Sequence, residues 1–378
     1  MDLRANNESW IPDESLMVKP VYCGPGLWYD KQTGLIHCRL AHTQLQLLEK
    51  TGYRLPQYRG ETDPRKLPLV IAPFASRPLV VDQAMHVRFQ DLVIRGGGYV
   101  TVDLAFGVGI EFDHCTIYCG TYGIWSKGTG PLKMTHCGVY GMIPPWAFRT
   151  ENCSYAYSPF VYPPFLEGLA TEERQGASTA RPKQVTRHIA RLHFYQNTML
   201  FPAYHLGLGF TGGLAYGWEP ETPRRVFNNI FAFYGLDGKY PILFYGMRRD
   251  RADLQIDGDL HWSLTAGQAP PGDFFKPLRE HPIAKANLEK YPAGLGAHCL
   301  VGDPRFLAVS TDPQAVNDYR LRPDSPAVGH GVPLPAEWPD PLRPVQGPPD
   351  ICAIPSGGEP LKVGIHGRIT AGMLGEPD

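Results

Sequence analysis

A pattern of eight residues recurs at a spacing of about twenty-two residues, and it constrains the fold of this 378-residue chain more than any other feature. The three clearest copies are Val87–Ile94, Ile110–Ile117 and Leu132–Val139. Each copy alternates apolar and polar residues over four positions, passes through a turn residue and ends on an apolar residue. This predicts two short strands that meet at a corner. A repeat of this length indicates supersecondary units that stack on one another.

The pattern returns further along the chain. Leu192–Met199 fits all of it, Arg225–Phe231 fits from its second apolar position, and Ile256–His261 fits in part. The residue that follows the turn residue is therefore predicted to stack at one corner of successive units. These corner residues are Leu92, Cys115, Cys137, Asn197, Asn229 and Asp259. We interpret Cys115 and Cys137 as stacked interior thiols that pack as small hydrophobic side chains, with a disulfide as the alternative.

Composition excludes several classes of protein. Lys and Arg number 36 against 37 Asp and Glu, so the chain lacks the basic excess of a nucleic-acid-binding protein. No run of eighteen apolar residues predicts a membrane span. The eight cysteines form no C-x-x-C pair, which argues against a zinc or thioredoxin motif. The start of the chain lacks the apolar core of a signal peptide. We expect a secreted or periplasmic protein whose signal was removed, with a cytoplasmic protein as the alternative.

The short strands, the Asn at a tight corner and the period together resemble the pectin lyase-like superfamily of right-handed parallel β-helices. Pro25–Ile36 reads as a hairpin with its turn at Lys31–Gly34, similar to a module that precedes the helix in several β-helical glycoside hydrolases. Four segments resemble the closing coil of many bacterial β-helix proteins: Asp303–Phe306, Asp318–Leu321, Asp324–Ala327 and Asp350–Ala353. The resemblance implies an all-β chain that forms a single right-handed parallel β-helix, a fold that hosts lyases, hydrolases, epimerases and adhesins.

The chain divides into three parts on this interpretation. Residues 1–66 hold the hairpin and a cap, in which the Leu-rich His42–Tyr53 is a short helix or part of the cap. Residues 67–330 form the β-helix, with loop insertions at 143–186 and 264–298 thrown from one face. Residues 331–378 are rich in Pro and wrap the outside of the last coils.

The resemblance places the substrate along the first sheet of the β-helix. The strands assigned to it are Val100–Leu104, Tyr122–Trp125 and Tyr204–Leu208, with Trp146–Arg149 and Pro241–Tyr245 as further members. If Val102, Ile124 and Leu206 point inward, alternation directs Thr101, Asp103, Trp125 and His205 to the groove.

Hydrolysis of a glycosidic bond is the favoured chemistry. It needs two carboxyl groups, and we assign Asp103 and Glu219, with His205 assisting. A lyase or epimerase acting on uronic acids is the alternative, with His205, Tyr245 and Arg248 as its site. The predicted substrate-binding residues are Trp125, Trp146, Arg149, Tyr204, Trp218 and Arg224. No cofactor or metal is expected, apart from calcium for a lyase. The partner is a polysaccharide or oligosaccharide, and the oligomeric state stays open.

Each assignment has a structural alternative. Asp103 also suits a turn cap or a pair with a neighbouring coil, and His205, Glu219 and Arg248 also suit a solvated surface. The tryptophans also suit packing. A third class of function is a glycan-binding adhesin or tail-spike without catalysis. A second polar strip, on the second sheet, is interpreted as solvated structure that stabilises the sheet: Arg88, Glu111, Asp113, Lys133, His193, Tyr195 and Arg225. His114 and His136, which stack at the corner, carry the same interpretation.

Overall fold

The computed structural model describes residues 26–30, 32–39, 62–66, 71–73, 75–98, 100–127, 132–142, 148–149, 153–156, 159–161, 192–202, 224–234, 253–309, 317–336, 338, 344 and 346–360. Strands far outnumber helices in these residues, so the all-β class is confirmed. Within the same residues, no helix is long and apolar enough to cross a membrane.

The predicted hairpin is present near the start of the chain. Strand β1 (Gly26–Tyr29) pairs antiparallel with β2 (Ile36–Arg39). Asp30 organises the turn, because its Oδ1 accepts from the backbone N of Gln32 at 2.9 Å and its Oδ2 from Thr33 Oγ1 at 2.6 Å. Gly34 closes the turn at φ +73°. His42–Tyr53, the predicted cap, lies outside the described residues.

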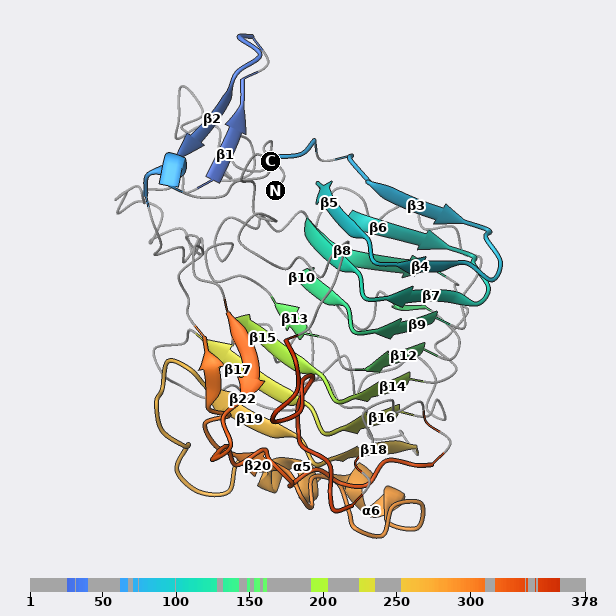
Figure 1. Ribbon diagram of the computed structural model, residues 1–378, viewed down its shortest axis with the longest axis vertical. Helices are drawn as coiled ribbons and strands as arrows, with labels where there is room; N and C mark the ends of the chain where they lie inside the picture. Colours follow the sequence, from blue (N-terminus) through green and yellow to red (C-terminus); the bar gives the residue numbers. More distant parts are fainter. Residues whose placement is uncertain are drawn as a thin grey trace, which may run out of the picture.

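Two parallel sheets make up most of the described structure (Figure 1). The smaller sheet has the order β4 (Arg88–Gln90), β7 (Ile110–Asp113), β9 (Leu132–Thr135), β12 (Cys153–Ala156), β14 (Leu192–Tyr195), β16 (Arg224–Phe227) and β18 (Leu254–Asp257). The larger sheet has the order β3 (Leu79–Asp82), β6 (Val100–Ala105), β8 (Thr116–Lys127), β10 (Gly138–Met142), β13 (Pro159–Val161), β15 (Thr198–Pro202), β17 (Ile230–Tyr234), β19 (Leu260–Ser263) and β20 (Leu300–Val301). Strands β5 (Val93–Gly97) and β11 (Phe148–Arg149) also pair with β8. The chain alternates between the two sheets, and we call one strand of the smaller sheet with the following strand of the larger sheet a pass. Strands adjacent within a sheet come from successive passes.

The register of the smaller sheet matches the sequence repeat. Phe89 pairs with Phe112, and Phe112 with Met134, so equivalent positions of the first three copies lie side by side. Phe112, Met134 and Ile117 are fully buried. Glu111 and Lys133, which precede Phe112 and Met134 on their strands, are partly exposed. Apolar residues at alternate positions therefore face one shared core, as the period of a strand requires.

One corner is built the same way at each pass where the structure describes it. The turn residues adopt left-handed backbone angles, with φ between 50° and 66°: Asp91, His114, His136, Gln196, Asn228 and Gly258. The next residue points inward, and Cys115, Cys137, Asn197, Asn229 and Asp259 are all buried. Cys115 and Cys137 are free thiols, which confirms the interpretation as stacked interior residues. Leu92 differs, because it lies at the first of these corners and is 39% exposed.

Hydrogen bonds link the polar members of this corner. Asn229 Oδ1 accepts from both N and Nδ2 of Asn197 at 3.0 Å. Asp259 Oδ1 accepts from N and Nδ2 of Asn229 at 2.8 and 2.9 Å. Side chains thus satisfy backbone groups that the turn takes out of the sheet ladder.

Helices cover the core at the β18 end. The 264–298 segment, predicted as a loop, contains α5 (Lys276–Arg279) and α6 (Pro282–Asn287). Leu278 and Ile283 are fully buried in the same cluster as Leu254 of β18. Asn287 Oδ1 accepts from the backbone N of Leu254 at 2.7 Å, in the place where a further strand would pair. The predicted insertion at 143–186 likewise contains strands β11, β12 and β13, which continue both sheets.

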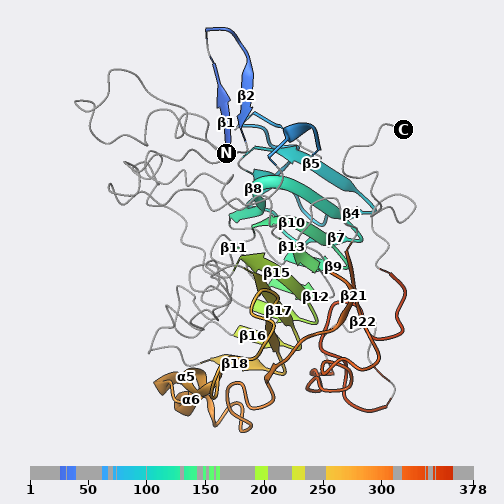
Figure 2. The same cartoon turned by 90° about the vertical axis from the view of Figure 1, so that its left-hand side faces the viewer.

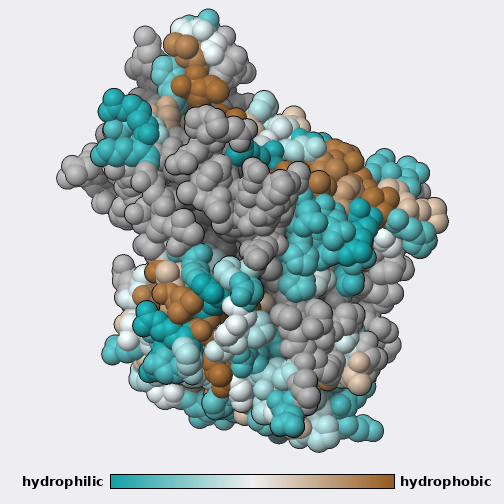
Figure 3. Space-filling model, viewed as in Figure 1, coloured by the Kyte–Doolittle hydropathy of each residue, from teal (hydrophilic) through white to brown (hydrophobic). Residues whose placement is uncertain are grey.

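At the opposite end, near β3, exposed apolar side chains gather in a patch (Figure 3). Its members are Val80, Met85, Leu92, Val93, Phe106 and Val108. No described element covers these side chains.

The C-terminal segment runs along the outside of the strands, and it is drawn in red in Figures 1 and 2. After the antiparallel pair β21 (Phe306–Ala308) and β22 (Asp318–Leu321), Val332 exchanges two hydrogen bonds of 2.8 Å with the side chain of Asn228. Trp338 stacks on His193 with ring centroids 4.2 Å apart, and it also contacts Tyr195 and Phe227. Val332 and Trp338 therefore hold this segment against β14, β16 and the corner that follows β16.

Candidate functional site

Two side chains of the predicted groove lie next to each other on the larger sheet. Asp103 of β6 pairs in register with Trp125 of β8. Their neighbours Val102 and Ile124 are fully buried in the core, so alternation directs Asp103 and Trp125 to the outer side of the sheet. Two of the predicted residues are thus brought together by adjacent strands.

The outer side is more enclosed than an open groove. Asp103 is 5% exposed and Thr101, on the same side of β6, is fully buried. Arg77 contacts Asp103, with Nη1 2.7 Å from Oδ2, and the Arg77 side chain is about half exposed. A carboxylate this well buried needs a compensating cation, which Arg77 supplies. Sequence reasoning missed Arg77, because it precedes β3, whose residue in register with Asp103 is Val80, and the repeat therefore gives no signal for this contact.

For two other predicted residues, only the strand is described. Arg149 ends β11, in register with Lys127 of β8, and Arg224 begins β16, in register with Leu254 of β18. Arg149 therefore belongs to the same sheet as Asp103, whereas Arg224 belongs to the other. The remaining predicted residues lie outside the described residues: Trp146, Tyr204, His205, Trp218, Glu219, Tyr245 and Arg248.

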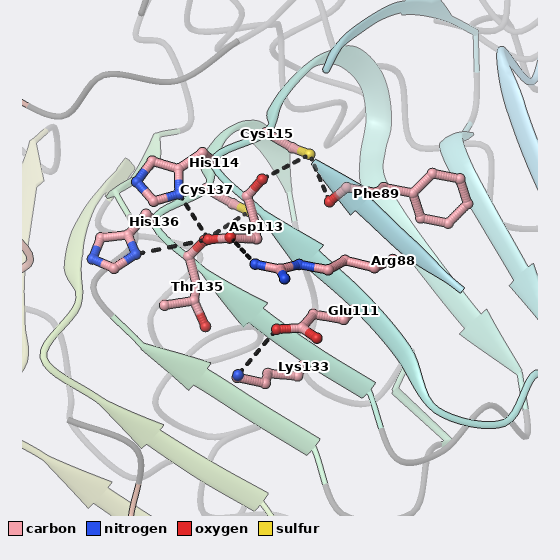
Figure 4. Close-up of polar contacts among 10 residues, drawn as sticks. All are labelled: Arg88, Phe89, Glu111, Asp113, His114, Cys115, Lys133, Thr135, His136 and Cys137. Carbon is pink, nitrogen blue, oxygen red and sulfur yellow. Dashed lines mark hydrogen bonds and ion pairs between the residues drawn. The ribbon is translucent and has the colours of Figure 1, made fainter. Parts of the chain in front are cut away.

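A second polar group lies at the corner of the smaller sheet, where Asp113, His114 and His136 converge (Figure 4). Asp113 Oδ1 lies 2.7 Å from His114 Nδ1 and 4.0 Å from His136 Nδ1. The two imidazoles stack with ring centroids 4.6 Å apart. Arg88, one strand away, contacts the other carboxylate oxygen, Oδ2. The predicted stack of His114 and His136 is therefore present, together with a carboxylate that faces both rings.

The surroundings of this corner set different protonation states for Asp113 and His136. Burial acts to raise the pKa of Asp113, but hydrogen bonds from Arg88 and His114 outweigh it, and the pKa lies below its usual value of 3.8. Burial, with repulsion from His114, lowers the pKa of His136 to about 4. Asp113 is therefore an anion and His136 a neutral imidazole near pH 7.

The rest of the polar strip is partly as predicted. Lys133 pairs with Glu111 across adjacent strands, with Nζ 3.0 Å from Oε1, as expected for sheet-stabilising ions (Figure 4). Tyr195, predicted to be solvated, is instead fully buried beneath Trp338. The covering residue lies more than a hundred positions along the chain, so no local pattern reveals it.

Comparison with protein-family models, with curated proteins and with solved structures finds no significant match.

Proposed function

We propose that the two parallel sheets belong to a single right-handed parallel β-helix. The support is the repeated passage of the chain between the sheets, the matching register of equivalent positions and the left-handed backbone at the described corners. Right-handed crossovers are nearly universal between parallel strands of one sheet, which favours that handedness. The helices α5 and α6 fill the role of a cap at one end, as stacked repeats require.

We further propose that this scaffold acts on a polysaccharide or oligosaccharide as a glycoside hydrolase, on the outer side of β6 and β8. The observation that carries the proposal is the pairing of Asp103 with Trp125 in register. Adjacent strands are about 4.8 Å apart, so an indole and a carboxylate fit against one sugar residue. The aromatic face packs on sugar C–H groups, and the Asp103–Arg77 pair offers an acceptor and donors to hydroxyls.

Asp103 supplies one of the two carboxyl groups in this proposal. Because hydrolysis with acid and base requires a second carboxyl group, Glu219 keeps that predicted role. Little of the Asp103 side chain reaches solvent. Arg77 or the surrounding chain must therefore move aside before Asp103 can contact the glycosidic bond. Arg77 is the more exposed partner and is the group that first meets substrate.

An activity screen over a panel of polysaccharides tests the proposal. We expect release of reducing sugar by the wild type, and a loss of at least about a hundredfold for Asp103→Asn, the scale of a general acid or base. Trp125→Ala is expected to raise KM more than it lowers kcat. Asp82→Asn, an exposed carboxylate on β3, is the matched control and keeps wild-type activity.

Other outcomes contradict the proposal in distinguishable ways. An unsaturated product, seen by its ultraviolet absorbance without hydrolysis, replaces the hydrolase with the lyase. Glycan binding without any product replaces it with a binding protein. Full activity in both Asp103→Asn and Trp125→Ala removes the site from the outer side of β6 and β8.

A further inference from the structure

The corner formed by Asp113, His114 and His136 has the composition of a metal site. One atom from each side chain can be chosen so that all three lie within 4.8 Å of one another (Figure 4). Imidazole nitrogen and carboxylate oxygen are the usual ligands of Zn²⁺ and its neighbours in the transition series. None of the three residues belongs to the outer side of β6 and β8, so the inference stands apart from the proposed hydrolase.

The distances are close to those that a bound ion needs. Ligand atoms about 2.0–2.1 Å from a tetrahedral ion lie about 3.3 Å from each other. Asp113 Oδ1 is 2.7 Å from Nδ1 of His114 and 4.0 Å from Nδ1 of His136, values on either side of that spacing. The two distances differ from that spacing by about 0.6 and 0.7 Å.

The backbone holds the two imidazoles in place. His114 and His136 occupy equivalent corner positions at φ 50° and 53°, and hydrogen-bonded strands on either side fix the spacing between them. Histidine tolerates left-handed angles better than most residues. The equivalent residues elsewhere are Asp91, Gln196, Asn228 and Gly258, so the pair of histidines is confined to adjacent passes within the described corners.

A second set of residues orients the ligands. Arg88 contacts Asp113 Oδ2, which leaves Oδ1 directed at the histidines. Outer partners of this kind commonly fix the carboxylate of a metal site. The charged groups around the corner are Arg88 and Lys133 as cations and Glu111 and Asp91 as anions, besides Asp113 itself. The His114 side chain is 36% exposed, which gives an ion and its water ligands access from solvent.

We propose that Asp113 Oδ1, His114 Nδ1 and His136 Nδ1 bind one divalent transition-metal ion of the Zn²⁺ class, with its remaining positions open to water. A site with three protein ligands and open positions is of the catalytic rather than the closed structural type. The fold does not depend on a bound ion, because Gln196 forms the same left-handed corner in a later pass without a metal-binding side chain.

Titration of the untagged, chelator-treated full chain with Co²⁺ tests the proposal. We expect a visible absorption spectrum that saturates with one ion at this site and is displaced by Zn²⁺. His114→Asn and His136→Asn keep the left-handed turn and are expected to weaken binding at least about tenfold. His86→Asn is the matched control, since His86 is exposed at φ 53° at another corner, and it binds as the wild type does. Circular dichroism and the Tm of the metal-free variants check that each is folded.

A measurement on the wild type alone covers the case in which the variants do not fold. Copper and ascorbate oxidise histidines that ligate the copper, and peptide mass mapping locates the oxidised residues. Oxidation at His114 and His136 that excess Zn²⁺ suppresses, without oxidation at His86, supports the site. Absence of oxidation at both residues, or unchanged Co²⁺ binding in both folded variants, overturns it.

Discussion

Asp259 Oδ1 accepts two hydrogen bonds from Asn229, from its backbone N at 2.8 Å and from its side-chain Nδ2 at 2.9 Å. The carboxyl group is fully buried, and the other oxygen, Oδ2, has no hydrogen-bond partner among the described residues. Burial raises the pKa of Asp259 well above its usual value, and the bonds from Asn229 offset this only in part. Asp259 therefore occupies the next position of an asparagine ladder with a carboxyl group that favours its neutral form.

The first prediction concerns Asp259→Asn. An amide keeps the acceptor for Asn229 and never ionises, so at pH 8 the variant avoids the proton uptake that folding requires of Asp259 and should be more stable than the wild type by roughly 1–3 kcal/mol, the scale of one to two pKa units. A group with a raised folded pKa contributes stability that is complete below its unfolded pKa, near 4, and is lost as the pH rises. The gain should therefore shrink toward pH 4. Urea unfolding at pH 4 and pH 8 measures it, and equal gains at both pH values would contradict it.

The second prediction concerns His261, a fully buried imidazole in β19 that stacks on Phe231 and meets Phe275 edge-on. Burial lowers its pKa from 6.5 to about 3. The unfolded chain binds a proton between these values while the folded chain does not, so stability falls as the pH drops through that interval. Between pH 7.5 and pH 5 this residue costs about 2 kcal/mol. His261→Leu should lose that much less stability over the interval, as followed by urea midpoints. His37→Leu, an exposed change on β2, is the matched control.

The third prediction concerns the packing of the C-terminal segment. Trp338 is 7% exposed and covers the fully buried Tyr195. Trp338→Ala removes a large buried side chain and should cost about 3 kcal/mol. It should also speed proteolysis within residues 331–360, because the segment loses its main apolar contact with β14 and β16. Trp338→Phe should restore part of the Tm. Normal Tm and protease resistance in the alanine variant would show that the segment is held by other contacts.

The fourth prediction concerns the interior thiols. Burial raises the pKa of both Cys137 and Cys352, which are inaccessible as well as protonated. Burial also raises the pKa of Cys38 of the hairpin, but its side chain is partly exposed, so in the native protein N-ethylmaleimide should label it at least about tenfold faster than either of them. Peptide mass mapping of native and urea-unfolded samples measures the difference. Rapid native labelling of Cys137 would place the corner open to solvent.

Periodic features of the fold were accessible from the sequence. The alternation in the first three repeats identified β4, β7 and β9 in register, and it placed Cys115 and Cys137 inside. The strands inside the insertion predicted at 143–186 were not accessible from the sequence, because a Pro-rich and aromatic stretch follows Cys153–Ala156 and hides its alternation. Helices α5 and α6 are too short for a helical period to emerge.

The candidate sites divide along the same line. Adjacent Asp103 and Trp125 followed from alternation and from the repeat, since both are properties of neighbouring strands. The contact of Arg77 with Asp103 depends on how a side chain from outside the repeat folds back. The convergence of Asp113 with two histidines depends on the exact register between β7 and β9, and a shift by one residue would separate them.

The left-handed corner also bears on how such a protein changes over evolutionary time. The turn residues Asp91, His114, His136, Gln196 and Asn228 share one backbone shape while their side chains differ in charge and in hydrogen-bonding groups. Gln196 and Asn228 are buried against the C-terminal segment, but Asp91, His114 and His136 reach the surface, where a substitution alters the exterior without changing the inward residue that follows. New chemistry can therefore arise at these corners by single replacements, and neighbouring passes can combine two of them, while the core keeps its packing.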